Sequence, residues 1–200
     1  MNLLKNSTIK ENRNILCVLA VYVFLLLFFC SKMSPLYPVN DWYDLNLYFN
    51  IGKATFNGKT IYSEAFDHKG PLIFVIYGIG YLLSNSSFLG MYLIESICWI
   101  LMVFAAYFTA RLYFYKIYAF VIAIVFPVFL LTHTEEGGSA EEFIAISAVI
   151  SLFLFISYFR TNTTEHKPAD MLIHGIMFAL VVFIKINLAI FWFFPLLAIY

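Results

Sequence analysis

Charged residues are scarce in this chain, and this scarcity excludes a soluble globular domain. Asp, Glu, Lys and Arg make up 12% of the 200 residues, whereas soluble domains carry about 25%. Hydrophobic residues reach 62% and aromatic residues 20% of the sequence. Aromatic side chains are enriched where a protein meets lipid and the membrane surface. The composition therefore predicts an all-α integral membrane protein that forms a multi-span helical bundle.

Other features are missing as well, and each absence removes a class of function. The net charge is +0, which gives no sign of a nucleic-acid partner. The 3 cysteines lie within or beside apolar segments and lack the spacing of metal ligands. The sequence has no complete phosphate-binding loop, no His-Glu-x-x-His pair, no nucleophilic serine elbow and no internal repeat. We therefore predict no metal site and no cofactor from such motifs.

Apolar segments of the length that crosses a bilayer, roughly 17–25 residues, follow one another along the chain. Lys5, Lys10 and Arg13 precede the first of them, and no small-residue cleavage site follows it, which indicates a retained signal anchor with a cytoplasmic N-terminus. The stretch 171–200 is long for one span. A lysine in hydrocarbon costs several kcal/mol, so we expect a break near Lys185. The predicted spans are about 14–30, 88–110, 117–133, 143–159, 171–186 and 188–200.

The apolar segment 71–83 is too short for a clear span, and the charges of the later loops decide its place. If it does not cross, the two short basic loops are cytoplasmic, and the loop 132–142, with four glutamates and no lysine or arginine, lies outside. That distribution follows the positive-inside rule, whereas a crossing segment would invert it. We therefore predict one extracytoplasmic loop over 31–87, with interfacial helices at about 41–56 and 71–83.

Two carboxylates, Asp41 and Asp44, open the first interfacial helix just outside the predicted membrane. Leu45 begins an apolar stripe at helical spacing, and Tyr48 stands with the two acids on the adjacent polar edge. We expect the stripe to face lipid and the acids to face water or a headgroup. A carboxylate in that place can take a proton from a hydroxyl as a general base, or it can bind a metal ion. The alternative is that both are solvated loop acids or helix caps.

The segment from Asp67 to Pro71 places an acid, an imidazole, a cation, a glycine and a proline in succession. Pro71 suits the first turn of a helix, and Gly70 allows a close approach of the backbone. Helix N-termini favour anions, so Lys69, with His68 beside it, is a candidate for binding a phosphate. The alternative is a helix cap next to a lysine that reaches the membrane surface.

The glutamates of the loop 132–142 differ in how well local structure explains them. Glu141 and Glu142 fall in the first turn of the next helix, where the helix dipole favours acids. Glu135 and Glu136 lie outside that turn, so the helix dipole explains their presence less well. They are therefore the candidates to orient a substrate or a divalent ion.

Glu95 is an isolated acid within the span 88–110. Ionisable groups inside a membrane are costly and tend to pair with one another. Lys185 is the natural partner by depth, so a structural Glu95–Lys185 ion pair is one interpretation. Binding of a lipid phosphate by Lys185 is the competing one.

The loop sequence resembles that of membrane glycosyltransferases of the GT-C fold. These include the protein O-mannosyltransferases, the lipid A aminoarabinose transferases and bacterial RgtA/B/C/D-like enzymes. The segment 44–54 is similar to the Asp-led helix of the family, and 57–72 is similar to its continuation in bacterial members. The resemblance extends over about 14–200, and its specific part is 41–72. Family members are longer, so we expect this chain to be an N-terminal portion.

This resemblance implies a transferase that moves a sugar from a polyprenyl-phosphate donor to a cell-envelope acceptor: a glycan, a lipid or a protein. Asp44 would be the catalytic base, with Asp41 as the alternative. A divalent cation at the glutamates is the one cofactor to consider, and the expected location is a bacterial cell membrane. The residues expected to bind the substrates are His68, Lys69, Lys185, Glu135, Glu136 and Tyr48.

Two other classes of function stay open at the level of sequence. A transporter or lipid flippase would use Glu95 and Lys185 as coupling charges within the membrane, although the paired halves typical of transporters are missing. A non-catalytic assembly protein would tolerate replacement of Asp44 and Lys69. The residues of the loop 31–87 favour the transferase.

Overall fold

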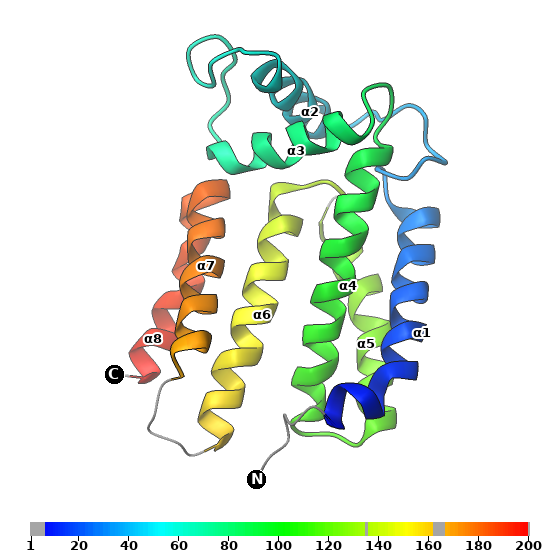
Figure 1. Cartoon of the computed structure of the whole chain (residues 1–200), viewed down its shortest axis with the longest axis vertical. Helices are drawn as coiled ribbons and strands as arrows, with labels where there is room; N and C mark the ends of the chain where they lie inside the picture. Colours follow the sequence, from blue (N-terminus) through cyan, green and yellow to red (C-terminus); the bar gives the residue numbers. More distant parts are fainter. Residues whose placement is uncertain (1–6, 135, 162–166, 200) are drawn as a thin grey trace.

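The computed structural model describes residues 7–134, 136–161 and 167–199, and within these ranges the chain is helical, without strands. Most helices stand side by side as a bundle, and two lie across one end of it (Figure 1). The all-α prediction is confirmed for this part of the chain. The elements are α1 (Ser7–Cys30), α2 (Tyr43–Phe56), α3 (Pro71–Leu83), α4 (Leu89–Arg111), α5 (Lys116–Leu131), α6 (Ala140–Thr161), α7 (Pro168–Lys185), the 3₁₀ segment η1 (Ile186–Trp192) and α8 (Phe193–Ile199).

Four stretches of the described chain are long and apolar enough to cross a membrane. They are Glu11–Cys30, Leu89–Arg111, Ala140–Arg160 and Pro168–Ala198. α5 is shorter, with 16 residues, and would extend about 24 Å against a hydrocarbon core of about 30 Å. Four such helices fit a membrane protein, as the composition predicts.

The last apolar stretch is bent into two segments, as the expected break near Lys185 requires. α7 ends at Lys185, whose extended backbone (φ −158°, ψ 92°) separates it from η1. The ring centres of Phe178 and Trp192 lie 5.8 Å apart, whereas an unbroken helix would separate these residues by about 21 Å. The chain therefore turns back after Lys185. This turn lies next to α3, because the N–H of Gly70 donates to the carbonyl of Ile184.

α2 and α3 pack against each other as one layer across the end of the bundle (Figure 1). The buried face of α2 consists of Leu45, Tyr48, Ile51 and Gly52, which recur at helical spacing. Gly52 lies so close to α3 that a Cβ there would be 2.6 Å from the backbone nitrogen of Gly78. The apolar stripe of α2 therefore faces α3. The expectation that it faces lipid is wrong, because the two apolar helix faces bury each other.

The connection between α5 and α6 lies at the end of the bundle that α2 and α3 cover. Tyr77 of α3 donates its hydroxyl to the carbonyl of Gly138 at 2.5 Å. The N–H of Lys32, just after α1, donates to the carbonyl of Glu136 at 2.8 Å. The connection that follows Arg111 lies at the opposite end (Figure 1). The two acidic regions of the sequence therefore share one end of the bundle, while a basic connection lies at the other.

Replacement of Gly52 by alanine tests the packing of α2 on α3. The added methyl group would press on backbone atoms of α3, and overpacking of this kind costs about 1–3 kcal/mol. We expect a lower melting temperature for Gly52→Ala, measured on the full chain in detergent. Gly175→Ala in α7 is the control, because no atom lies within 4 Å of its added carbon. Equal stability of the two variants would contradict the close contact.

Candidate functional site

Asp44 lies in the first turn of α2, with its side chain 41% exposed. Its Oδ2 accepts a hydrogen bond from the hydroxyl of Tyr48, one turn along the helix, at 3.1 Å. Tyr48 is buried, not on a polar edge as expected, because its ring packs against those of Phe74 and Tyr77. Burial and the Asp44 carboxylate raise the pKa of Tyr48, so its hydroxyl remains a donor. Among the described residues nothing donates to Oδ1 of Asp44, and a ligand can use that oxygen.

Lys69 lies beside Asp44 although a long loop separates them in the sequence. Its side chain is only 7% exposed, and its Nζ lies 3.9 Å from Oδ2 of Asp44. The same nitrogen lies 3.0 Å from Nε2 of His68 and 5.8 Å from the ring centre of Tyr48, within the range of a cation–π contact. The structure thus gathers a carboxylate, a phenol, an ammonium and an imidazole, all from expected site residues, into one cluster.

Contacts on two sides fix the backbone around Lys69. Tyr62 donates its hydroxyl to the carbonyl of Lys69 at 2.7 Å, and the N–H of Gly70 donates to the carbonyl of Ile184 at 2.9 Å. A Cβ on Gly70 would collide with the backbone carbonyl of Phe183, so the approach requires glycine. Tyr62 has a φ of 71°, which L residues adopt rarely. The segment that carries Lys69 is therefore fastened to the end of α7.

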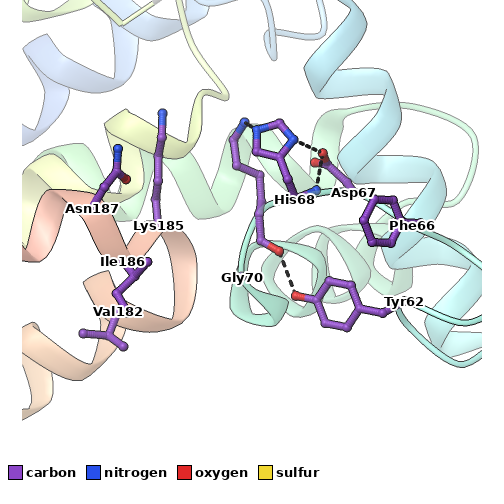
Figure 2. Close-up of a pocket in the computed structure, with 10 residues that line it drawn as sticks. Tyr62, Phe66, Asp67, His68, Gly70, Val182, Lys185, Ile186 and Asn187 are labelled. Atoms are coloured by element: carbon purple, nitrogen blue, oxygen red, sulfur yellow. Dashed lines mark hydrogen bonds and ion pairs between the residues drawn. The ribbon is translucent and has the colours of Figure 1, made fainter.

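A cleft of about 680 Å³ opens between this segment and the turn after α7 (Figure 2). Tyr62 and His68 lie on one side of it, and Lys185 and Asn187 lie on the other. Lys69 also lines the cleft, so two lysines contribute to the same lining. The two lysines bring positive charge and hydrogen-bond donors to a lining that also includes Asp67 and is mostly apolar.

Lys185 pairs with Glu141 in the first turn of α6 and not with Glu95. Its Nζ contacts Oε1 of Glu141. Glu95 is fully buried in α4, where the Ser31 hydroxyl lies 2.8 Å from each of its carboxylate oxygens. The expected Glu95–Lys185 ion pair is therefore wrong. The break after α7 places Lys185 at the end of the bundle, next to α6, instead of beside α4.

Glu95 and Glu142 are buried carboxylates beneath the α2–α3 layer. Glu142 accepts hydrogen bonds from the indole N–H of Trp99 and from the N–H of Gly138. Buried carboxylates need such donors, because an unpaired one costs several kcal/mol. These bonds hold the connection between α5 and α6, whose Gly138 carbonyl in turn receives the hydroxyl of Tyr77.

Three expected site residues lie apart from the cluster or outside the described part of the chain. Asp41 is exposed ahead of α2, and within the described residues it has neither a hydrogen bond nor an ion pair. Glu136 is exposed, and its carboxylate lies 3.8 Å from Nζ of Lys32, near the end of α1. Glu135 falls outside the described residues. Of the two aspartates, Asp44 is the one with partners in the cluster.

The structure adds Asp67 and Glu141 to the site. The position of Asp67 directly before His68 is visible in the sequence, but its burial is not. The helix dipole accounts for the place of Glu141 in the sequence, and no local signal indicates its contact with Lys185. Among the described residues no three His, Cys, Asp or Glu side chains are grouped so that they could hold a metal ion.

Replacement of Ser31 by alanine tests whether the buried hydrogen bonds beneath the α2–α3 layer stabilise the fold. The variant removes the donor to the buried Glu95 side chain, and a hydrogen bond of this kind contributes about 0.5–1.5 kcal/mol. We expect Ser31→Ala to unfold at a lower temperature than the parent chain. Ser63→Ala, at an exposed position, serves as the control. A loss of stability no greater than that of the control would argue against the support that we assign to Ser31.

The chain matches no protein-family model, no curated protein and no solved structure. The case for a function therefore rests on the residues of the cluster and the cleft. These residues bring a carboxylate, an imidazole and two lysines together at one end of a bundle of apolar helices.

Proposed function

We propose that this chain is, or is part of, a membrane glycosyltransferase of the GT-C type. It transfers a sugar from a polyprenyl-phosphate donor to a hydroxyl group of a cell-envelope acceptor. The observation that carries the proposal is the contact of Asp44 with Lys69 at the edge of a cleft that Lys185 also lines. Glycosyl transfer from a lipid phosphate needs a base for the acceptor and a cationic site for the leaving phosphate, and this arrangement offers both.

Asp44 acts as the general base in this reaction. Its Oδ1 takes the proton of the acceptor hydroxyl while the acceptor oxygen forms a bond to the anomeric carbon of the sugar. The bond from that carbon to the phosphate oxygen breaks, and the lipid phosphate leaves with the electron pair. Attack from the side opposite the leaving group inverts the anomeric centre. Tyr48 supports the base, because its hydroxyl donates to Oδ2 and orients the carboxylate.

Lys69 and Lys185 bind the phosphate group of the donor. Negative charge develops on the phosphate as it leaves, and fixed positive charges stabilise that change. Lys69 has the greater effect, because its side chain is buried and its field is screened less by water. Lys185 also faces Glu141, which offsets part of its charge. His68 and Asn187 line the same cleft and offer further polar contacts.

The architecture suits a donor that arrives within the bilayer. The cleft lies at the end of the bundle where α2 and α3 lie across the helices, so a lipid tail can extend along the bundle while its phosphate enters the cleft. We place this end outside the cytoplasm, with the N-terminus inside, because the connection after Arg111 at the other end is basic. A bacterial cell membrane is the expected location.

Asp44→Asn tests the assignment of the base. The substitution keeps the shape of the side chain but removes its ability to take a proton, and loss of general-base catalysis lowers rates by about 10²–10⁴-fold. We expect transfer of labelled sugar from polyprenyl-phosphate donors to fall by that factor in membranes that contain the full chain. Asp41→Asn is the matched control and should stay near the parent rate. Full activity of Asp44→Asn at equal protein level would remove Asp44 from the chemistry.

Lys185→Met tests the phosphate site from the side of α7. The variant keeps the apolar stem and removes the charge, so the KM for the donor should rise by about tenfold or more. Lys53→Met, at an exposed position on α2, is the control and should leave the KM unchanged. An unchanged donor KM in Lys185→Met would mean that this lysine holds Glu141 and does not bind the donor.

A further inference from the structure

We propose that Asp67 and His68 are positioning residues, which hold the Lys69 ammonium at one place between Asp44 and the cleft. In this arrangement Nδ1 of His68 faces the Asp67 carboxylate and Nε2 faces the ammonium. The inference rests on the proposed function in one respect, because it takes the phosphate of the lipid donor as the ligand of Lys69. It assigns a task to two residues that take no proton from the acceptor in the proposed reaction.

His68 connects the buried carboxylate to the ammonium. Its Nδ1 lies 2.8 Å from Oδ1 of Asp67, and its Nε2 lies 3.0 Å from Nζ of Lys69 (Figure 2). The ring is 76% exposed, yet both of its nitrogens have partners. Asp67, His68 and Lys69 are consecutive in the sequence, and their side chains form a chain of contacts that ends beside Oδ2 of Asp44.

The chemistry of these atoms fixes where the protons lie. An ionised carboxylate only accepts hydrogen bonds, so we expect the ring hydrogen of His68 on Nδ1, which lies 2.8 Å from Oδ1 of Asp67. If Nε2 carried a hydrogen as well, it would face the N–H groups of Lys69 at 3.0 Å, donor against donor and cation against cation. Lysine amines bind protons far more tightly than imidazole does. The arrangement is therefore consistent with a neutral imidazole whose Nε2 accepts a hydrogen bond from the charged Lys69.

Asp67 is suited to hold the imidazole in this tautomer. The residue is 8% exposed, and its Oδ1 also accepts the backbone N–H of His68 at 2.7 Å. Its Oδ2 is buried and has no hydrogen-bond partner among the described residues. Its polar contacts within the described part of the chain are thus all with His68. Second-layer carboxylates act in this way on catalytic histidines, whose tautomer is set by the bond at the other ring nitrogen.

Lys69 needs such support because a lysine side chain is a point charge on a flexible stem. A charge that moves stabilises a leaving phosphate less than one that is already in place. Here the carbonyl of Lys69 is held by Tyr62, the next residue is held by Ile184, and the ammonium is held by His68. Backbone and side chain are therefore fixed by different contacts, and His68 supplies the one that orients the charge.

The tautomer of His68 can be measured without any transferase assay. The full chain contains 4 histidines, so ¹⁵N-histidine labelling gives few ring signals, and His68→Gln assigns the one of interest. We expect ring nitrogen shifts of a neutral imidazole protonated at Nδ1 at neutral pH. A neutral ring protonated at Nε2, or an imidazolium, would overturn the arrangement proposed here. His133→Phe, at an exposed position, is the control for the assignment.

The effect on Lys69 can be measured by binding of polyprenyl monophosphate to the full chain in lipid nanodiscs, with polyprenol as the uncharged control. We expect His68→Phe to weaken binding about tenfold, the value of one lost charge-assisted hydrogen bond. His68→Gln should recover most of the affinity, because its side-chain carbonyl can accept from Lys69, and a merely structural role would not predict this rescue. Competition by inorganic phosphate separates recognition of the phosphate group from recognition of the lipid tail.

Lys69→Met separates failure of this inference from failure of the proposed function. If Lys69→Met loses binding and His68→Phe does not, the positioning role is overturned and the phosphate role of Lys69 stands. If Lys69→Met binds polyprenyl monophosphate as tightly as the parent chain, the phosphate role of Lys69 falls, and with it the effect assigned here to His68 on the donor. The ring nitrogen shifts then still decide whether Asp67 and His68 hold the ammonium.

Discussion

The backbone hydrogen bond from the N–H of Gly70 to the carbonyl of Ile184 joins the two parts of the molecule that form the cleft. One part is the layer of α2 and α3, and the other is the turn after α7. The contact brings two main chains together without a side chain between them, which is why it requires glycine at 70. Because Lys69 precedes Gly70 and Lys185 follows Ile184, this one bond also sets the width of the cationic cleft. The α2–α3 packing then brings Asp44 to the same place.

Beneath the layer, an apolar bundle ends in a polar interior. Ser31, Glu95, Trp99 and Glu142 are buried there and linked by hydrogen bonds to one another or to the backbone of Gly138. Polar groups in a membrane-type bundle tend to pair with one another, since leaving one unpaired costs several kcal/mol. The hydrogen bonds of these buried groups depend on one arrangement of the α5–α6 connection. The α2–α3 layer contacts that connection through the hydrogen bond of Tyr77 to Gly138. The buried polar residues and the layer are therefore joined through the backbone of Gly138.

Local signals in the sequence predict the helices well. The side-chain partners of several residues depend on long-range contacts, and the sequence does not predict those. The segment 71–83 matches α3, because Pro71 and the following apolar run define a helix start within a few residues. The break near Lys185 follows from the cost of a charge in hydrocarbon. The partner of Lys185 does not, since its contact with Glu141 depends on how α6 and α7 pack. Periodicity does not tell whether the apolar stripe of α2 faces lipid or another helix, because lipid and an apolar helix face are equally apolar.

The two walls of the cleft come from segments that lie on either side of α4, α5 and α6 in the sequence. A chain is synthesised from its N-terminus, so Asp44, Tyr48 and Lys69 emerge long before the turn that follows α7. Until that turn arrives, the carbonyl that accepts the hydrogen bond from Gly70 and the second lysine of the cleft are missing. The cleft therefore cannot form on a partly synthesised chain. The order of the elements delays the appearance of the candidate site until the last helices have been made.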